Sequence, residues 1–163
     1  MLSAPYTRHH PGCTIDPISR KLTLLNASGD KTMELIEQLQ KLALREDKLA
    51  ALWLYGSRAR GDHHSGSDYD LAVGFIDRLE DPLERRLRPE LLAESWLSEL
   101  GLPEKVLSIV DIGLVPIPLG IAILSEGKLL VDRYPQIRLT LESRMLSRWE
   151  LDYQHHQQHY GAL

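Results

Sequence analysis

The sequence predicts a single α/β domain, in which amphipathic helices alternate with short apolar strands. The length of 163 residues is typical of one domain. With 43% hydrophobic and 26% charged residues, the composition is that of a globular protein, which excludes a disordered or collagen-like chain. Apolar residues recur every three or four positions in the expected helices, and they run continuously or alternate in the expected strands.

The first part of the chain contains one expected helix and two expected strands. Residues 30–45 predict a helix, because apolar residues lie three or four positions apart on one face. These residues are Met33, Ile36, Leu39, Leu42 and Ala43. Residues 49–55 are apolar and too few for a helix with its own core, so they predict a buried strand. Residues 68–75 alternate small or acidic residues with apolar ones, which predicts a second strand with one acidic and one apolar face.

The second part predicts three helices and two further strands. Residues 83–100 predict a helix that Pro82 begins and Gly101 ends, with Trp96 and Leu97 in the core. Three short elements follow, a strand at residues 106–112, a helix at 118–125 and a strand at 128–131. Residues 135–160 predict a long helix, because a stripe of residues recurs every fourth position. The stripe consists of Ile137, Leu141, Met145, Trp149 and Tyr153, of which the last two belong either to the core or to a partner surface.

Charge, hydropathy and cysteine content restrict the partners and the location. The formal charge of −4 gives no general basic surface, so direct binding to nucleic acid is not expected. The longest apolar stretch, residues 106–124, is interrupted by polar residues, prolines and glycines, so no membrane partner is expected. Residues 1–28 hold no continuous apolar core, so we interpret them as an extension and not as a secretory signal. The single cysteine, Cys13, excludes an internal disulfide and fits a cytoplasmic location.

Residues 54–73 carry the pattern that indicates chemistry. Gly56 and Ser57 stand where a strand ends and a helix begins, and the free N–H groups at such a helix start favour an anion. A phosphate group fits there, with the Ser57 hydroxyl as a further donor and Arg58 or Arg60 as the neutralising charge. The simpler alternatives are a tight turn without a ligand and two solvated arginines.

Asp68 and Asp70 form the second part of the pattern. Because they are two positions apart on a strand, their carboxylates point to the same face. Two like charges so close require a cation, and Mg²⁺ prefers carboxylate and phosphate oxygens. Two such ions about 4 Å apart stabilise both the attacking and the leaving oxygen of an in-line displacement. The alternative is an acid pair at the edge of a loop without a ligand.

Gly56-Ser57, ten further residues and then Asp68-Tyr69-Asp70 resemble the signature of the DNA polymerase beta-type nucleotidyltransferase superfamily. From residue 33 to residue 131, the order of elements resembles that of the minimal nucleotidyltransferases (MNT), antitoxins that pair with HEPN toxins. The resemblance implies a short mixed sheet flanked by helices, with ATP as substrate and Mg²⁺ as cofactor. It implies that Asp68 and Asp70 are catalytic and bind metal. The nucleotide-binding residues that it implies are Gly56, Ser57, Arg58, Arg60 and Ser67.

The same resemblance implies a reaction and a partner. AMP passes from ATP to a hydroxyl, and in this family the acceptor is a tyrosine of the HEPN toxin, an RNA-cleaving protein that adenylylation silences. The chain then divides into an extension (residues 1–29), a minimal nucleotidyltransferase domain (30–132) and a C-terminal helix that contacts the toxin (133–163). A hetero-oligomer of antitoxin and toxin is expected.

One position departs from the pattern of this family. Members usually carry a third carboxylate on the later strand, where it accepts the proton of the acceptor hydroxyl or helps to hold a second metal ion. The register of the sequence places Ser108 at that position. Asp111, the nearest acid, has the opposite strand parity, so it substitutes only if the strand bulges.

Two other functions therefore stay open. A catalytically impaired antitoxin neutralises its toxin by complex formation alone, and a small-molecule nucleotidyltransferase of the aminoglycoside-modifying type shares the same core motif. The histidines are expected to be solvated, although the i, i+4 pair near the C-terminus has the spacing of a transition-metal chelate. Five of the seven histidines are meant, namely His63 and His64 in the polar spacer and His155, His156 and His159 in the last helix.

Overall fold

The computed structural model describes residues 17–160, with side chains described from residue 31 to residue 158. The described residues belong to two units, with the boundary between residues 35 and 36. Helix α1 (Pro17–Arg45) continues through this boundary. It begins well before residue 30, where the periodicity places its start, so the later half of the expected extension is helical. Proline suits the first position of a helix, because the N–H group that it lacks has no partner there.

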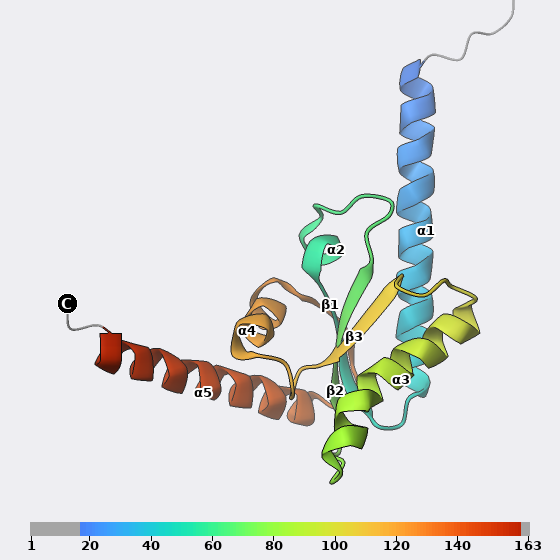
Figure 1. The fold of residues 1–163 in the computed structure, drawn as a ribbon. Helices are drawn as coiled ribbons and strands as arrows, with labels where there is room; N and C mark the ends of the chain where they lie inside the picture. Colours follow the sequence, from blue (N-terminus) through green and yellow to red (C-terminus); the bar gives the residue numbers. More distant parts are fainter. Residues whose placement is uncertain (1–16, 161–163) are drawn as a thin grey trace, which may run out of the picture. The chain divides into compact units, whose positions relative to one another are not determined.

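Four short strands form one mixed sheet in the order β3-β2-β1-β4 (Figure 1). Strand β1 (Leu49–Tyr55) lies between β2 (Tyr69–Phe75) and β4 (Lys128–Asp132) and is antiparallel to both. Strand β3 (Leu107–Asp111) runs parallel to β2 at one edge. The expected mixed sheet is confirmed, and each strand begins and ends within one residue of its predicted position.

Four further helices connect and follow the strands. Helix α2 (Gly56–Arg60) joins β1 to β2, α3 (Pro82–Leu100) joins β2 to β3, α4 (Ile117–Glu126) joins β3 to β4, and α5 (Pro135–Tyr160) follows β4. The Asp81 side chain caps α3 by accepting hydrogen bonds from two backbone N–H groups, and Gly101 ends it with φ of 62°. The long C-terminal helix is confirmed. Within residues 17–160, none of the helices has the length and apolar character that crossing a membrane requires.

One face of the sheet packs against α4 and α5. Trp53 of β1 and Ala72 of β2 form a buried cluster with Ile123 of α4 and Met145 of α5. Gly120 of α4 allows this contact, because a Cβ atom at that position would overlap the Met145 side chain. The apolar stripe of α5 therefore contributes its first half to the core.

The opposite face of the sheet is buried as well. Leu52 and Leu71, which alternate with the first set along their strands, are fully buried. The last turns of α1 bury Leu39 and Leu42, and α3 packs on β3 and buries Trp96. The expected core position of Trp96 is thus confirmed, at 1% exposure. Because both faces are covered, β1 and β2 are held rigidly at their ends, where the polar motif lies.

Candidate active site

The two halves of the motif lie at the same end of the β1–β2 pair. The last residue of β1, Tyr55, pairs with Asp70 near the start of β2. Gly56 follows Tyr55 with φ of +70°, a left-handed conformation that glycine adopts at low cost, and opens α2. Antiparallel pairing therefore brings the Gly56-Ser57 turn and the Asp68-x-Asp70 segment together, although ten residues separate them in the sequence.

Gly56 lies directly against the carboxylate of Asp70. A Cβ atom at position 56 would be 2.5 Å from Oδ2 and 3.3 Å from Cγ of Asp70. Real Cβ atoms do not approach other atoms so closely, so a larger residue would displace either the turn or the carboxylate. Glycine is required here for two separate reasons, the positive φ and the contact with Asp70.

The two aspartates are in different surroundings. Asp70 is half-buried, whereas Asp68, immediately before β2, is exposed. Burial raises the pKa of Asp70, the negative charge of Asp68 raises it further, and the positive charge of Arg60 acts in the opposite direction. The carboxylates are thus close enough to repel each other, and a divalent cation bound between them would relieve that repulsion.

Tyr55 is a neighbour of this carboxylate pair that the motif does not include. Its side chain is half-buried at the end of β1. Burial raises the pKa of the Tyr55 hydroxyl, and the charge of Asp70 raises it further. Tyr55 lies beside Asp70 because the two residues pair across β1 and β2. The sequence could have indicated this neighbour only through the register of these two strands.

Arg58 is buried and not solvated. Its Nε donates hydrogen bonds to the carbonyl oxygens of Ser67 (3.0 Å) and Asp68 (3.2 Å), and one terminal nitrogen donates to Ser67 at 2.6 Å. The guanidinium also lies 3.8 Å from the centre of the Tyr69 ring. With 8% of its surface exposed, Arg58 fastens α2 to the chain at Asp68. The sequence-based alternative of a solvated Arg58 is wrong.

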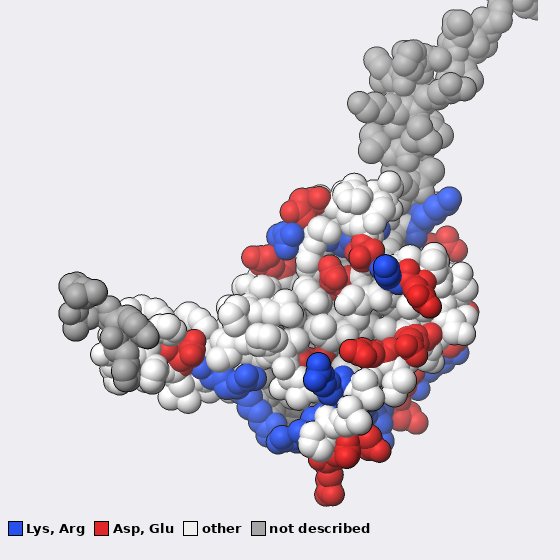
Figure 2. Space-filling model, in the orientation of Figure 1, with Lys and Arg blue, Asp and Glu red and all other residues white. Residues whose placement is uncertain are grey.

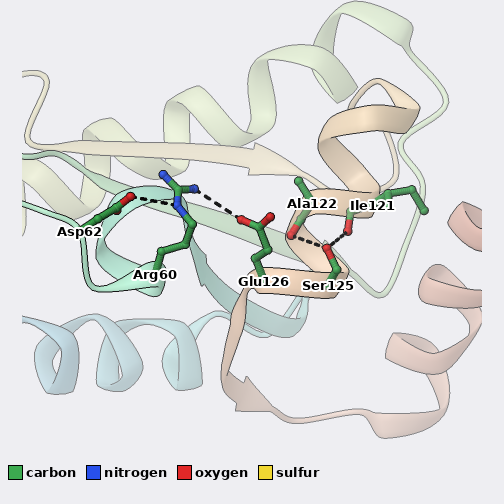
Figure 3. Close-up of polar contacts among 6 residues, drawn as sticks. All are labelled: Arg60, Asp62, Ile121, Ala122, Ser125 and Glu126. Atoms are coloured by element: carbon green, nitrogen blue, oxygen red, sulfur yellow. Dashed lines mark hydrogen bonds and ion pairs between the residues drawn. The ribbon is translucent and has the colours of Figure 1, made fainter.

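Arg60 lies on the rim of the site and links two carboxylates (Figure 3). It contacts Asp62 at 3.3 Å and Glu126, at the end of α4, at 3.5 Å. The turn of α4 before Glu126 is closed by Ser125, whose hydroxyl donates to the carbonyl of Ile121 at 2.8 Å. Nearly half of the Arg60 side chain is exposed, so it keeps access to solvent and to a ligand.

The spacer before β2 is organised by short local hydrogen bonds. The Ser67 hydroxyl accepts a hydrogen bond from the backbone N–H of His64 (3.0 Å), and Nδ1 of His64 accepts one from Gly66 (3.1 Å). The carbonyl of Ser57 accepts from the backbone N–H groups that close α2. Ser57 and Ser67 are both half-buried, and they directly follow Gly56 and directly precede Asp68 in the sequence.

Ser108 is the partner of Asp70 in the parallel β2–β3 pair. The position next to Asp70 is therefore occupied by an exposed hydroxyl and not by an acid. Asp111 pairs with Val73, farther along β2, and its Oδ1 accepts a hydrogen bond from the backbone N–H of Gly113 at 2.8 Å. Pairing continues in register from Ser108 to Asp111, so no bulge turns Asp111 towards the site. Among the described side chains, no group of three or more histidines, cysteines or acids is placed to hold a metal ion.

The end of α5 is exposed. From residue 146 to residue 158, every described side chain is open to solvent. Trp149 and Tyr153 are 46% and 54% exposed, and their rings stack with centroids 5.8 Å apart. Of the two alternatives for these residues, the core is excluded. The side chain of His159 and the whole of Cys13 lie outside the described part of the chain.

Comparisons with known proteins agree with this geometry. Residues 37–136 match the family model described as polymerase beta, nucleotidyltransferase. Among solved structures, a toxin–antitoxin complex with AMP-PNP contains a chain that is 24% identical, with a TM-score of 0.58 over 75% of this chain and 92% of that one. A mutant of the MntA–HpeT toxin–antitoxin pair gives 23% identity and a TM-score of 0.57 over the same shares.

A third similar structure contains a tri-AMPylated HEPN toxin from Shewanella oneidensis in complex with an MNT antitoxin. Its matching chain is 21% identical, with a TM-score of 0.51 over 80% of this chain and 92% of that one. At these identities the three structures establish a shared fold. No curated protein matches the chain significantly. The match to the family model spans more than half of the chain and includes the Gly56–Asp70 motif, and the chain therefore belongs to the polymerase beta nucleotidyltransferase family.

Proposed function

We propose that this chain is the antitoxin of a HEPN toxin–antitoxin pair and that it transfers AMP from ATP to a tyrosine hydroxyl of its toxin. The observation that carries the proposal is the contact of Gly56 with the carboxylate of Asp70, which unites a phosphate-binding turn with an acidic pair. The partner and the reaction are supported by the similar structures, which include a toxin–antitoxin complex with AMP-PNP and an AMPylated HEPN toxin bound to an MNT antitoxin.

Each residue of the motif has a role in this proposal. Gly56 and Ser57 hold the phosphates of ATP, while Arg60 and Ser67 contribute at the rim. Asp68 and Asp70 bind Mg²⁺, a fit that rests on two mutually repelling carboxylates on one face. The metal would neutralise charge on the phosphates and on the leaving group. Arg58 is a positioning residue, because it holds the backbone from which the Asp68 side chain projects.

The transfer forms a bond between the tyrosine oxygen and the α-phosphorus of ATP and breaks the bond to pyrophosphate, which leaves. The tyrosine also loses its proton during this step. Ser108 occupies the neighbouring strand position, and the described residues place no third acid there. We therefore expect water to accept the proton and the reaction to be slower than with an acid at that position.

The exposed end of α5 is the proposed contact surface for the toxin. Trp149 and Tyr153 present stacked aromatic rings to solvent, and Leu146 and Leu151 are at least half exposed beside them in the sequence. Exposed aromatic residues supply much of the binding energy at protein interfaces. A helix that packs one face of its first half against the core and leaves its second half open suits an anchor for a partner.

The experiment that tests the proposal is intact mass spectrometry of the HEPN protein encoded beside this chain. The two full-length proteins are incubated with ATP and Mg²⁺, and the toxin is expected to gain one or more AMP units. The double variant Asp68→Asn/Asp70→Asn should produce no gain. Asp47→Asn, which changes a 91% exposed surface acid outside the site, is the matched control and should behave as the wild type. No mass gain with the wild-type protein would refute the enzymatic mechanism.

A second candidate function is neutralisation by complex formation alone. The observation that favours it is Ser108 beside Asp70, where the family usually places an acid. In that case Asp70→Asn should protect cells from the toxin as well as the wild type does. If the same substitution abolishes protection while the complex still forms, the binding-only mechanism is excluded.

A further inference from the structure

A cavity with several charged side chains in its lining lies at the end of the sheet opposite to the motif. It has a volume of about 460 Å³ and is formed where β2 and β3 end, between the start of α3 and the middle of α5. Five arginines from three separate segments line it, namely Arg78, Arg85, Arg88, Arg144 and Arg148. In the lower part of Figure 2, basic side chains gather along α5 and around a hollow beside it.

The two acids in the cavity compensate only part of this positive charge. Asp77 is paired with Arg88 at 2.8 Å and with Lys48 at 3.8 Å. Burial raises the pKa of Asp77, but the hydrogen bond and charge of Arg88 together with the charge of Lys48 outweigh burial, so the pKa is lowered. Asp111 accepts a hydrogen bond from the backbone of Gly113. With five arginines and two aspartates, the lining carries three net positive charges on a chain whose formal charge is −4. Such a local concentration of positive charge attracts anions.

Some of the arginines are fixed in place and others are available. Arg85 donates to the carbonyl oxygens of Leu79 (2.8 Å) and Glu80 (2.9 Å), so its guanidinium is held at the wall. Arg144 and Arg148 lie one helical turn apart on α5 and are exposed, as is Arg78 in the loop after β2. Within residues 31–158, no carboxylate forms an ion pair with these last three. Like charges gathered in this way create a positive potential that attracts an anion.

The remaining wall of the cavity is apolar. The guanidinium carbon of Arg88 lies 3.8 Å from the centre of the Phe75 ring. Leu141 and Met145 of α5 also line the cavity. A small-molecule site typically combines apolar walls with a few charged groups in a volume of about 300–1,000 Å³. The cavity is thus suited to a ligand with an anionic group and an apolar part.

We propose that this cavity binds a small organic phosphate. Guanidinium groups match phosphate oxygens in geometry and donate two hydrogen bonds at once, and a phosphate monoester with two negative charges suits a lining with three net positive charges. The site is distinct from the motif, because Asp70 and Phe75 lie towards opposite ends of β2. It does not depend on the toxin–antitoxin proposal, and either one can fail without the other.

The test uses the full-length protein with EDTA, so that no metal is bound at Asp68 and Asp70. Phenyl phosphate is the probe, and its binding is measured by isothermal titration calorimetry. We expect the affinity of the wild type for phenyl phosphate to fall as the salt concentration rises. The double variant Arg144→Gln/Arg148→Gln should bind phenyl phosphate at least tenfold more weakly, and phenol should not bind to the wild type. Lys41→Gln/Arg86→Gln is the matched control, because it removes two exposed positive charges outside the cavity, and it should bind like the wild type.

Three results would overturn this proposal. The first is absence of phenyl phosphate binding to the wild type, and the second is equal affinity in the two double variants, which would place the anion elsewhere. The third is binding of hexaglutamate without binding of phenyl phosphate, which would indicate an acidic protein segment as the occupant. Inorganic phosphate serves as a further comparison and should bind more weakly than phenyl phosphate, because it lacks the apolar part. Equal binding of the two would refute the role of the apolar wall.

Discussion

Asp70 and Ser108 are direct partners in the parallel β2–β3 pair, so the group beside Asp70 on β3 is a hydroxyl. In parallel strands, paired residues project to the same side of the sheet, and an acid at position 108 would therefore face the same volume as Asp70. The activity of the protein should depend on this position.

Ser108→Asp is expected to accelerate AMP transfer to the toxin. General base catalysis typically raises a reaction rate roughly 10²–10⁴-fold. We expect the rate of AMP transfer to rise at least tenfold, which is less than this range because the new carboxylate enters a site that is not adapted to it. The initial rate of toxin modification, measured by mass spectrometry, checks this. Ser108→Ala should react at the wild-type rate. A lower rate with Ser108→Asp than with Ser108→Ala would contradict the assignment of this position.

Gly56→Ala is expected to abolish AMP transfer and to destabilise the protein. The left-handed conformation costs a residue with a Cβ atom about 1–2 kcal/mol, and the added carbon would also collide with the Asp70 carboxylate. Gly61→Ala is the matched control, because Gly61 has φ of +82° and no atom within 4 Å of its Cβ position. Urea unfolding should show a lower free energy of unfolding for both variants than for the wild type, with the larger decrease for Gly56→Ala. Activity should survive only in Gly61→Ala.

Arg58→Lys is expected to lower the free energy of unfolding by about 2–3 kcal/mol, because lysine cannot donate to two carbonyl groups in the same planar arrangement. The matched substitution at the neighbouring surface arginine, Arg60→Lys, should lower the free energy of unfolding clearly less than Arg58→Lys, as exposed ion pairs contribute little. Urea denaturation measures both. Equal losses in the two variants would contradict the distinction between a buried anchor and a rim residue.

The raised pKa of Asp70 predicts a specific pH dependence of stability. The folded protein disfavours the charged form of Asp70, so this side chain lowers the free energy of unfolding when the pH is above its raised pKa in the folded state. The destabilisation disappears as the pH falls below the pKa of aspartate in the unfolded chain, which is about 3.9. Asp70→Asn should therefore be more stable than the wild type at pH 7, with the difference vanishing near pH 3. Urea unfolding at both values tests this. A constant difference would exclude titration of Asp70 as its cause.

Trp149→Ala/Tyr153→Ala is expected to weaken the complex with the toxin without changing the stability of the free protein, because both rings are exposed. Loss of exposed aromatic anchors typically costs an interface about 2 kcal/mol or more. Calorimetric titration with the toxin gives the affinity, and thermal unfolding gives the stability. The control is Leu139→Ala, which changes an exposed residue in the first half of α5 and should leave the affinity for the toxin unchanged. If the double variant keeps wild-type affinity, the toxin binds elsewhere.

The sequence by itself determined the types and order of the elements. Strands β1 to β4 and helices α3 to α5 follow from apolar periodicity together with proline and glycine positions, which are local properties. The side-chain period of two also predicted that Asp68 and Asp70 share a face, and the resemblance to the family predicted Ser108 at the position of the third carboxylate. The structure adds that Ser108 pairs with Asp70. The start of α1 was missed, because the apolar face by which we delimited this helix begins only at Met33.

Only the tertiary structure decided which of two similar residues has which role. Arg58 and Arg60 are both charged and two positions apart, yet one is buried against Ser67 and the other pairs with Glu126 on a distant helix. The contact of Gly56 with Asp70 likewise depends on strand pairing. The arginine-lined cavity combines residues from a loop and two helices that are separated by up to 70 positions. Such relationships arise from packing between segments, and no local pattern in the sequence encodes them.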